Sequence, residues 1–319
     1  FAARGVETKV EDDGRMFPVT DDSATIIDCL RRAADTAGVR VLTTSGVRRA
    51  EAAGPGSFWL TLTDGSEVRC ERLLIATGGN RSSAGFTIAE SFGHTIEPLV
   101  PSLFTFHSDD PRLVGLSGLS VADAAAVVAG TKLAERGPML ITHWGLSGPV
   151  ILKLSAWGAR ELAARNYQFT VRISFAPGRS REDVVRELSA ARAANPRKQL
   201  TTWCPLGLPL RLWERLVAAA GIAATATWTS VGNAALAALA GQISAADFKV
   251  EGKSLFKDEF VTCGGISLNE INFKTMESKL VPGLYFAGEV VDVDGVTGGF
   301  NFQNAWTTGF HAGIDIAAH

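Results

Sequence analysis

Cysteines are few in this sequence, and none lies close to another. The four are Cys29, Cys70, Cys204 and Cys263, with no CxxC pair among them. A zinc ribbon or a vicinal redox dithiol needs such a pair, so the spacing excludes both kinds of site. It is typical of unpaired thiols in a reducing compartment.

Long apolar runs are also missing. No stretch reaches the ~18 uninterrupted apolar residues of a membrane-spanning helix, so we expect no membrane partner. The Ala-rich stretches 121–130 and 233–240 are short or interrupted, and they predict helices packed against the rest of the protein. No Ser/His/Asp order for nucleophilic catalysis stands out. The histidines are too scattered for a metal motif, and we expect no metal; they are His94, His107, His143, His311 and His319.

An excess of positive charge is absent as well. The 319 residues include 31 Lys and Arg against 33 Asp and Glu, a net charge of −2. A protein that neutralises phosphates needs Lys and Arg in excess on one face, so we expect no direct nucleic-acid binding. With 46% hydrophobic and 20% charged residues, the composition is that of a soluble globular protein.

The first hundred residues carry helix and strand patterns in turn. The predicted elements are a helix within 20–38 between Ser23 and Gly38, a strand over 39–42, and a hairpin of 58–62 and 68–76 around Asp64-Gly65. Leu73 to Ala76 is continuously apolar, as in a parallel strand covered on both faces. It ends in the turn Thr77-Gly78-Gly79.

The middle of the chain has short strand patterns followed by helical ones, and this change of pattern predicts an inserted domain. Its predicted elements are strands over 103–106, 139–142 and 169–175 and helices over 181–194 and 208–220. We therefore expect a first domain made of 1–97 and 266–319. The insertion, 98–265, would have a β part (98–178 and 241–265) and a helical part (179–240).

The strongest local signal lies in residues 283–313. A buried strand over 284–287 stops at Gly288-Glu289, and the glycine-rich turn Thr297-Gly298-Gly299 opens a helix over 301–316. Such a helix start presents free N–H groups and a positive end to a ligand. Glu289 can accept hydrogen bonds from a polyol, and the glycines let a flat ring approach the backbone. An ordinary strand–turn–helix with a glycine cap is the plainer interpretation.

The turn at 77–79 is weaker evidence alone, because strand-to-glycine turns are common in α/β proteins. Paired with the turn at Gly288, it predicts a crevice at the carboxyl ends of two strands of one open sheet. Ligands bind at such crevices in α/β folds.

Several motifs occur in the order found in the BaiN/YhiN-like family of NAD(P)/FAD-dependent oxidoreductases, to which aminoacetone oxidase is related. The sequence resembles this family over nearly its whole length, and the wording of 142–160 is closest to plant and algal members. The motifs are 14–18 (GRMFP), 76–79 (ATGG), 142–149 (THWGLSGP), 261–265 (VTCGG), 275–279 (TMESK) and the 283–313 block.

The resemblance implies an α/β (α+β overall) flavoprotein with FAD lying across the crevice, and NAD(P)H as a possible electron donor. The isoalloxazine would lie on the 297–301 turn, and the helix start would stabilise negative charge on the ring. His143 and Trp144 would lie on a turn of the inserted domain, which would close over the flavin. Weak catalytic candidates are His143 and Asn301. The cofactor-binding candidates are Val47, Thr77, Gly78, Gly79, Gly288, Glu289, Thr297, Gly298, Gly299, Phe300, Asn301 and Gln303.

One family feature is missing from the sequence. The strand–GxGxxG–helix that cradles the FAD pyrophosphate does not occur, and the chain starts at Phe1, near where the family is already past it. We therefore expect a Rossmann-like domain without its first βαβ unit, carrying an inserted β-barrel-like plus helical domain.

Two functions of different class follow. The first is an FAD-dependent oxidoreductase that transfers a hydride between flavin N5 and a small organic substrate or NAD(P)H. The alternative is a non-catalytic flavoprotein-like subunit for binding or assembly, with an incomplete cofactor site. The sequence leaves open the substrate, the oligomeric state and the compartment, cytoplasm or, for a plant or algal protein, a plastid or other organelle.

Overall fold

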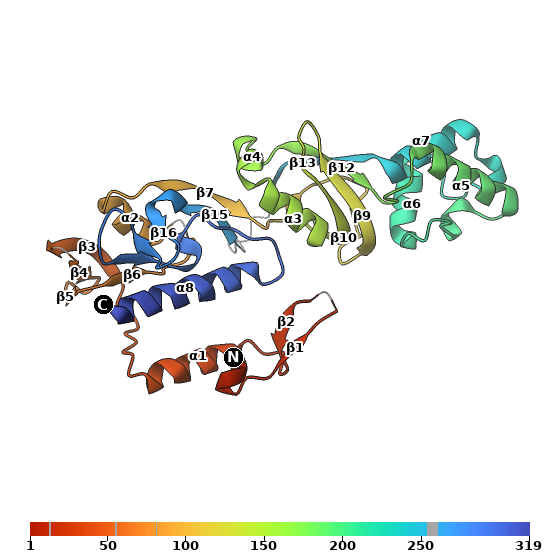
Figure 1. The fold of residues 1–319 in the computed structure, drawn as a ribbon. Helices are drawn as coiled ribbons and strands as arrows, with labels where there is room; N and C mark the ends of the chain where they lie inside the picture. Colours follow the sequence, from red (N-terminus) through yellow and green to blue (C-terminus); the bar gives the residue numbers. More distant parts are fainter. Residues whose placement is uncertain (13, 55, 81, 254–260) are drawn as a thin grey trace. The chain divides into compact units, whose positions relative to one another are not determined.

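Strands β7 (Ile96–Ser102) and β15 (Val261–Ile266) pair with each other, and the chain passes between two structural units within them. In this computed structural model, unit 1 consists of residues 1–98, 264–293 and 298–319, and unit 2 of 99–263 and 294–297. The structure describes residues 1–12, 14–54, 56–80, 82–253 and 261–319. Figure 1 labels the elements along the chain.

Unit 1 begins with η1 (Ala2–Arg4), the antiparallel pair β1 (Thr8–Val10) and β2 (Met16–Pro18), and α1 (Ala24–Thr36). The predicted helix is confirmed, with Ser23 at the N-cap position, although the Asp22 carboxylate accepts the bond from the Ala24 N–H, at 2.8 Å. The predicted strand 39–42 is wrong. These residues pair with no described strand, and Val41 is 71% exposed. An apolar run forms a strand only where a neighbour supplies the hydrogen bonds.

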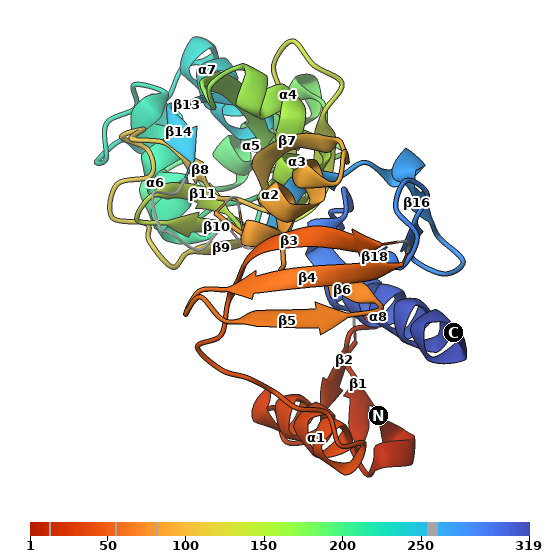
Figure 2. The same cartoon turned by 90° about the vertical axis from the view of Figure 1, so that its left-hand side faces the viewer.

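A three-stranded antiparallel sheet follows, drawn in orange in Figure 2. Its strands are β3 (Val47–Gly54), β4 (Ser57–Leu62) and β5 (Glu67–Cys70). The hairpin around Asp64-Gly65 is confirmed, since β4 pairs with β5. The run 68–76 is not one strand, however: β5 ends at Cys70, and β6 (Leu73–Ile75) belongs to another sheet. The sequence did not predict β3, because the charged residues Arg48, Arg49 and Glu51 interrupt the alternation of apolar and polar residues that marks a strand.

The second sheet of unit 1 has the order β16-β17-β18-β6. Its other strands are β16 (Ile271–Asn272), β17 (Glu277–Ser278) and β18 (Leu284–Phe286). β6 and β18 run parallel, as predicted. The expectation that both faces of β6 are covered is wrong for the described residues, since Leu74 is 37% exposed.

Helices flank this sheet. They are α2 (Ala84–Ser91), the short η4 (Leu268–Glu270) and η5 (Gly288–Val290), and α8 (Phe300–Ala318), which confirms the predicted C-terminal helix. The Tyr285 hydroxyl on β18 donates to the Asp315 carboxylate on α8, at 2.8 Å. Burial, and then this bond, raise the pKa of Tyr285 to about 12. The phenol therefore stays protonated and keeps α8 on the sheet.

Unit 2 contains a seven-stranded antiparallel sheet in the order β13-β12-β9-β10-β11-β8-β14. The strands are β8 (Phe106–His107), β9 (Ser120–Val128), β10 (Ala134–Thr142), β11 (Gly145–Ser147), β12 (Phe169–Ser174), β13 (Ala246–Val250) and β14 (Gly252–Lys253). In the described residues β13 and β14 are separate edges and no closed barrel is found, so the barrel-like expectation is not confirmed. Closure would need the two edge strands to pair.

Two local predictions for this sheet also fail. The Ala-rich stretch 121–130 is not a helix but strand β9, in which Val121, Ala124, Ala126 and Val128 are buried. Tertiary pairing with β10 and β12 overrides the helix propensity of alanine here. The predicted strand 103–106 shrinks to β8, because Leu103 has a left-handed φ of 56°. The strands predicted over 139–142 and 169–175 are confirmed within β10 and β12.

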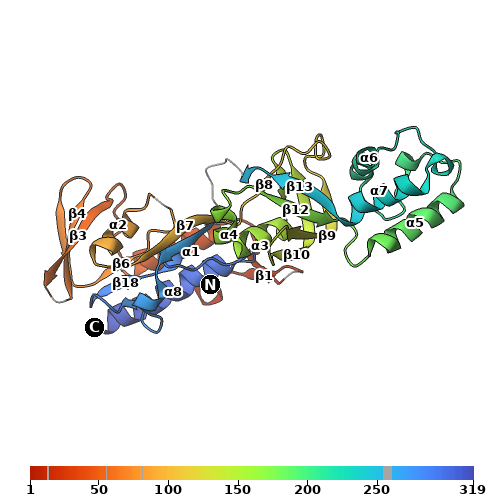
Figure 3. The same ribbon diagram turned by 90° about the horizontal axis from the view of Figure 1, so that it is seen from above.

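The rest of unit 2 is helical. α3 (Pro149–Trp157) packs on β9 and β10, followed by α4 (Ala159–Ala164); neither helix was predicted. The predictions of α5 (Arg181–Ala194), α6 (Leu210–Ala219) and α7 (Asn233–Ser244), which Figure 3 labels, are confirmed. The short η2 (Leu200–Thr202) and η3 (Trp228–Ser230) lie between them in the chain. One apolar cluster, reaching from Phe104 to Val250, joins these helices to the sheet. None of the helices in the described parts of the chain is both long and apolar enough to cross a bilayer.

Candidate functional site

The carboxyl ends of β6 and β18 bring two of the predicted glycine turns together. Ile75 and Phe286 are partners at the ends of the parallel pair, and the Ala287 N–H donates to the Ile75 carbonyl at 3.1 Å. The next residues along each strand are therefore neighbours. Gly78 and Gly288 both have φ near 76°, the left-handed conformation that favours glycine, so each strand turns away sharply at this edge.

Helix α8 is fastened to the turn after β18. The Gly288 N–H donates to the Thr308 hydroxyl at 2.9 Å, and that hydroxyl donates to the Asn304 carbonyl at 2.7 Å. A Cβ on Gly288 would lie 3.7 Å from the Ala305 Cβ, so the backbone comes close to the helix. The turn and one face of α8 form a common wall.

Two polar groups on this wall have no hydrogen-bond partner among the described residues. Burial raises the pKa of the Glu289 carboxyl, and no hydrogen bond from the described residues offsets that effect. The Nδ2 atom of Asn304, one helical turn before Thr308, is buried without a partner. Buried polar groups are normally hydrogen-bonded, so these two are suited to a polar ligand.

The start of α8 carries no side-chain cap. Gly299 is the N-cap residue with a left-handed φ of 86°, and Phe300 is the first helical residue. A Cβ on Gly299 would meet no atom within 4 Å. The N-cap residue therefore supplies no side-chain acceptor to the first turn, and there is room beside Gly299.

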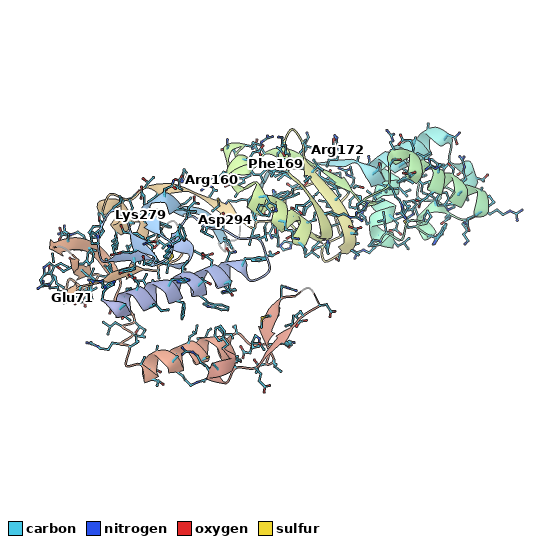
Figure 4. The ribbon with its side chains drawn as sticks, viewed as in Figure 1. Glu71, Arg160, Phe169, Arg172, Lys279 and Asp294 are labelled. Carbon is cyan, nitrogen blue, oxygen red and sulfur yellow. The ribbon has the colours of Figure 1, made fainter. Side chains whose placement is uncertain are left out.

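The remaining candidates are distributed as follows. Val47 is the first residue of β3 and belongs to the antiparallel sheet, apart from β6 and β18. Thr297 belongs to unit 2, with Asp294, which is labelled in Figure 4 and accepts a bond from Ser102 at 2.7 Å. Asn301 is partly buried on α8, and the Gln303 amide donates along the helix to Thr307 at 2.9 Å.

His143 and Trp144 form the turn between β10 and β11 of unit 2. Their ring centroids are 4.8 Å apart, and the indole also lies 6.2 Å from the ring of His107. Gly145 is required beside them, because a Cβ there would come within 2.4 Å of the Phe106 carbonyl oxygen. The exposed His143 ring and the partly buried indole make a packed aromatic turn.

Sequence reasoning missed a buried network in unit 1. The Nδ1 atom of His94 lies 2.9 Å from the Glu270 carboxylate, and its Nε2 lies 2.9 Å from the Ser278 hydroxyl. This Ser–His–Glu order resembles a nucleophilic triad, but the His94 side chain is 0% exposed. The Ser278 oxygen also accepts the N–H groups of Leu280 and Val281. The network is therefore structural, and Ser278 lies within the TMESK motif, which was the available signal.

Gly85 was also missed. A Cβ at this position in α2 would lie 2.0 Å from the Thr77 hydroxyl oxygen and 2.9 Å from a methyl carbon of Ile75. Glycine therefore lets α2 approach the end of β6, directly beside the predicted turn. The sequence signal was the spacing of Gly78, Gly79 and Gly85 after an apolar strand.

A pocket in unit 2 is lined by a structural arginine, Arg112. Arg112 lies on its lining, stacked 4.0 Å over the ring of Phe248, and it binds both Asp110 oxygens and the Gln242 side chain. Its guanidinium thereby ties the 110–112 loop to α7. Arg112 also holds the pKa of Asp110 below its ordinary value, against the opposing effect of burial. In the described residues no three His, Cys, Asp or Glu side chains gather as metal ligands.

A parallel strand pair whose ends turn on glycines beside a helix is the ligand-binding edge of a Rossmann-type domain. Residues 1–315 match the family described as HI0933-like protein Rossmann domain, and the chain belongs to that family.

Curated relatives are similar over most of the chain. The ribosomal RNA dihydrouridine synthase of Haemophilus influenzae is 29% identical over 99% of this chain and 78% of its own length. The protein of the same name from Escherichia coli is 34% identical over 80% of this chain and 63% of its own length. The 3-dehydro-bile acid delta(4,6)-reductase of Clostridium scindens is 27% identical over 98% of this chain and 78% of its own length.

Proposed function

We propose that the chain binds FAD at the carboxyl ends of β6 and β18 and functions as a flavin-dependent oxidoreductase. The observation that carries this proposal is the common wall of Gly288, Glu289 and α8, which contains two unpartnered polar groups in a Rossmann-type domain. The family and the reductase relative support the same class of activity.

The residues present fit a dinucleotide. Ribityl and ribose hydroxyls are donors, and Glu289 is a half-buried carboxylate in need of donors. The Asn304 amide is a buried donor in need of an acceptor, such as a hydroxyl oxygen. The uncapped start of α8, open around Gly299, favours a group that carries negative charge.

The names of the relatives suggest a common reaction type. Dihydrouridine is uridine with its C5–C6 double bond saturated, and a delta(4,6)-reductase of a 3-dehydro compound acts on ring double bonds beside a 3-oxo group. In both substrates the double bond is conjugated with a carbonyl. We propose the same reaction for this chain: NAD(P)H and a proton saturate a carbonyl-conjugated double bond and leave NAD(P)⁺.

Bound FAD would supply the hydride carrier, since reduced flavin transfers a hydride from N5 to an electron-poor carbon. The chain's own residues would bind and orient. Glu289 would hold polyol hydroxyls, Asn304 would add a donor, and the α8 dipole would stabilise negative charge at its amino end. From the family resemblance we further propose that the Val47 backbone contacts the adenine and that His143 lies beside the substrate.

The decisive experiment is a titration of the purified chain with FAD, followed by flavin absorbance and by NADPH oxidation. We expect a bound yellow cofactor, and NADPH oxidation that depends on a 3-oxo-4,6-diene steroid or on a uridine-containing RNA. Glu289→Gln should weaken FAD binding by about 10-fold, because a charge-assisted hydrogen bond is worth about 1.5–3 kcal/mol. Glu90→Gln, an exposed carboxylate on α2, is the matched control and should bind normally.

The pH dependence of binding gives an independent measurement. Polyol donors stabilise the Glu289 carboxylate, so FAD binding should lower its raised pKa and release a proton. Affinity should then rise as the pH increases through the pKa of the free protein, and Glu289→Gln should remove that rise. A chain that stays colourless with excess FAD would instead support the non-catalytic subunit.

A further inference from the structure

The charges of the chain are strongly segregated. Residues 188–246 contain five Lys and Arg but a single acidic residue, Glu214, a net charge of +4. The rest of the chain carries −6, which together give the overall −2. The near-neutral total therefore hides a cationic helical part in unit 2.

Among the described residues, most of these cations pair with no carboxylate. Arg192 donates to the Val231 carbonyl at 3.0 Å and to the Asn233 side chain at 2.8 Å, and Arg211 donates to the Gly115 carbonyl. Such bonds orient a guanidinium but leave its charge in place. In contrast, Arg179 and Arg186, just before this segment, pair with Glu187 and Asp183.

Two exposed cations lie beside an exposed aromatic ring in this segment. Trp203 is 42% exposed, and the Lys198 ammonium lies 5.8 Å from its ring centroid, next to Arg197. The 196–198 loop is held in place by backbone bonds, from Trp228 to the Lys198 carbonyl and from Thr229 to the Pro196 carbonyl, both 3.0 Å. We call Arg197, Lys198 and Trp203 the 197–203 surface.

We propose that the 197–203 surface binds single-stranded RNA. Arg and Lys without carboxylate partners attract phosphates, and an exposed indole offers a platform on which a base stacks. Buried residues hold the neighbouring backbone in place: Trp213 and Trp228 stack on each other, and the Trp213 indole donates to the Leu200 carbonyl at 2.8 Å. The surface is therefore preformed, which lowers the entropic cost of binding.

The test is fluorescence anisotropy of a labelled uridine-rich single-stranded RNA with the full chain, measured across salt concentrations. We expect Arg197→Gln/Lys198→Gln to weaken binding and to reduce the slope of log K against log salt by about 1.4, or about 0.7 for each phosphate contact. Trp203→Ala should weaken binding at least ~5-fold with the slope unchanged, and Trp203→Phe should retain most of the affinity. Arg31→Gln/Arg32→Gln, which removes two exposed cations from α1, should bind within about 2-fold of the original chain, because it spares the phosphate contacts.

Three results would overturn the proposal: no RNA binding at low salt, a Trp203→Ala variant that binds normally, or an equal loss in the α1 control. Far-ultraviolet circular dichroism of each variant separates unfolding from lost binding. If the alanine variant misfolds, the Trp203→Phe variant still tests whether an aromatic ring at this position supports RNA binding. None of these measurements requires flavin. Failure here thus leaves FAD binding and NADPH oxidation intact, whereas failure of the proposed function leaves RNA binding intact.

Discussion

At the scale of single residues, burial decides which polar side chains are available to a ligand. His94, Glu270 and Ser278 satisfy one another, so their triad-like order has no free position for a substrate. Glu289 and Asn304 are left without partners on the wall beside α8. Sequence spacing could identify Glu289 at the end of a strand, but it could not show that the carboxyl is half-buried and unpaired.

The buried His94 should make stability depend on pH. Burial lowers its pKa, although Glu270 opposes the effect, so the folded protein holds the ring neutral. The unfolded chain binds a proton near pH ~6.5 and the folded chain does so only at lower pH. Stability should therefore be full above about pH 7 and fall as the pH decreases through ~6.5, by at most ~1.4 kcal/mol per pH unit.

Urea unfolding at several pH values between 5 and 8 measures this loss. His94→Gln should lower stability at pH 8 and reduce the pH dependence in this window. His311→Gln, an exposed histidine on α8, should leave the dependence unchanged. Glu270 has a lowered pKa and acts in a separate window, since its contribution is lost only below its usual value of ~4.3. An identical pH profile for His94→Gln and the original chain would refute the assignment.

At the scale of elements, close approaches set where helices meet strands. Gly85 lets α2 begin against the end of β6, while Thr308 and Asp315 hold α8 to the β18 side. Each contact positions one of the two turns of the candidate site. The glycine-rich turn predicted α8, yet it did not show which face of the helix meets the turn after β18.

Paired glycine substitutions test this view of α2. Gly85→Ala should destabilise unit 1 by about 1–3 kcal/mol, because the new methyl group overlaps Thr77 and Ile75. Gly313→Ala on α8 meets no atom within 4 Å and should stabilise the protein by about 0.5–1 kcal/mol through helix propensity. Thermal and denaturant unfolding measure both. Equal effects of the two changes would show that the approach of α2 is not tight.

At the scale of the whole molecule, the two units differ in core and in charge. The apolar cluster from Phe104 to Val250 lies entirely within unit 2. The chain leaves and re-enters unit 1 on the paired strands β7 and β15, so the ends of the 99–263 segment are neighbours. The expectation of no nucleic-acid binding came from the net charge of the whole chain. The RNA titration tests that expectation.

This arrangement predicts that residues 99–263 fold alone. A segment with its own core and adjacent ends meets the usual requirements of an independent domain. The isolated segment should unfold in one cooperative step, with buried tryptophan fluorescence from Trp213 and Trp228. A broad, non-cooperative transition would show instead that its core needs unit 1.

The sequence by itself determined the local elements whose pattern needs no distant partner. The helices at 24–36, 181–194 and 210–219 follow from periodicity, the helix at 233–244 from alanine content, and the helix at 300–318 from the glycine-rich turn before it. The hairpin around Asp64-Gly65 follows from its turn. The glycine turns after β6 and β18, and the family resemblance, came from motif spacing in the same way. These features depend on residues a few positions apart, which sequence patterns contain.

Only the tertiary structure decided the rest, because strands and sites depend on partners far along the chain. β9 is a strand despite its alanines since β10 and β12 pair with it, and 39–42 is not a strand since none of the described residues pair with it. The open edge of the seven-stranded sheet, the burial of His94 and the unpaired state of Glu289 are likewise long-range outcomes. The free energy of each residue type depends on its neighbours in space.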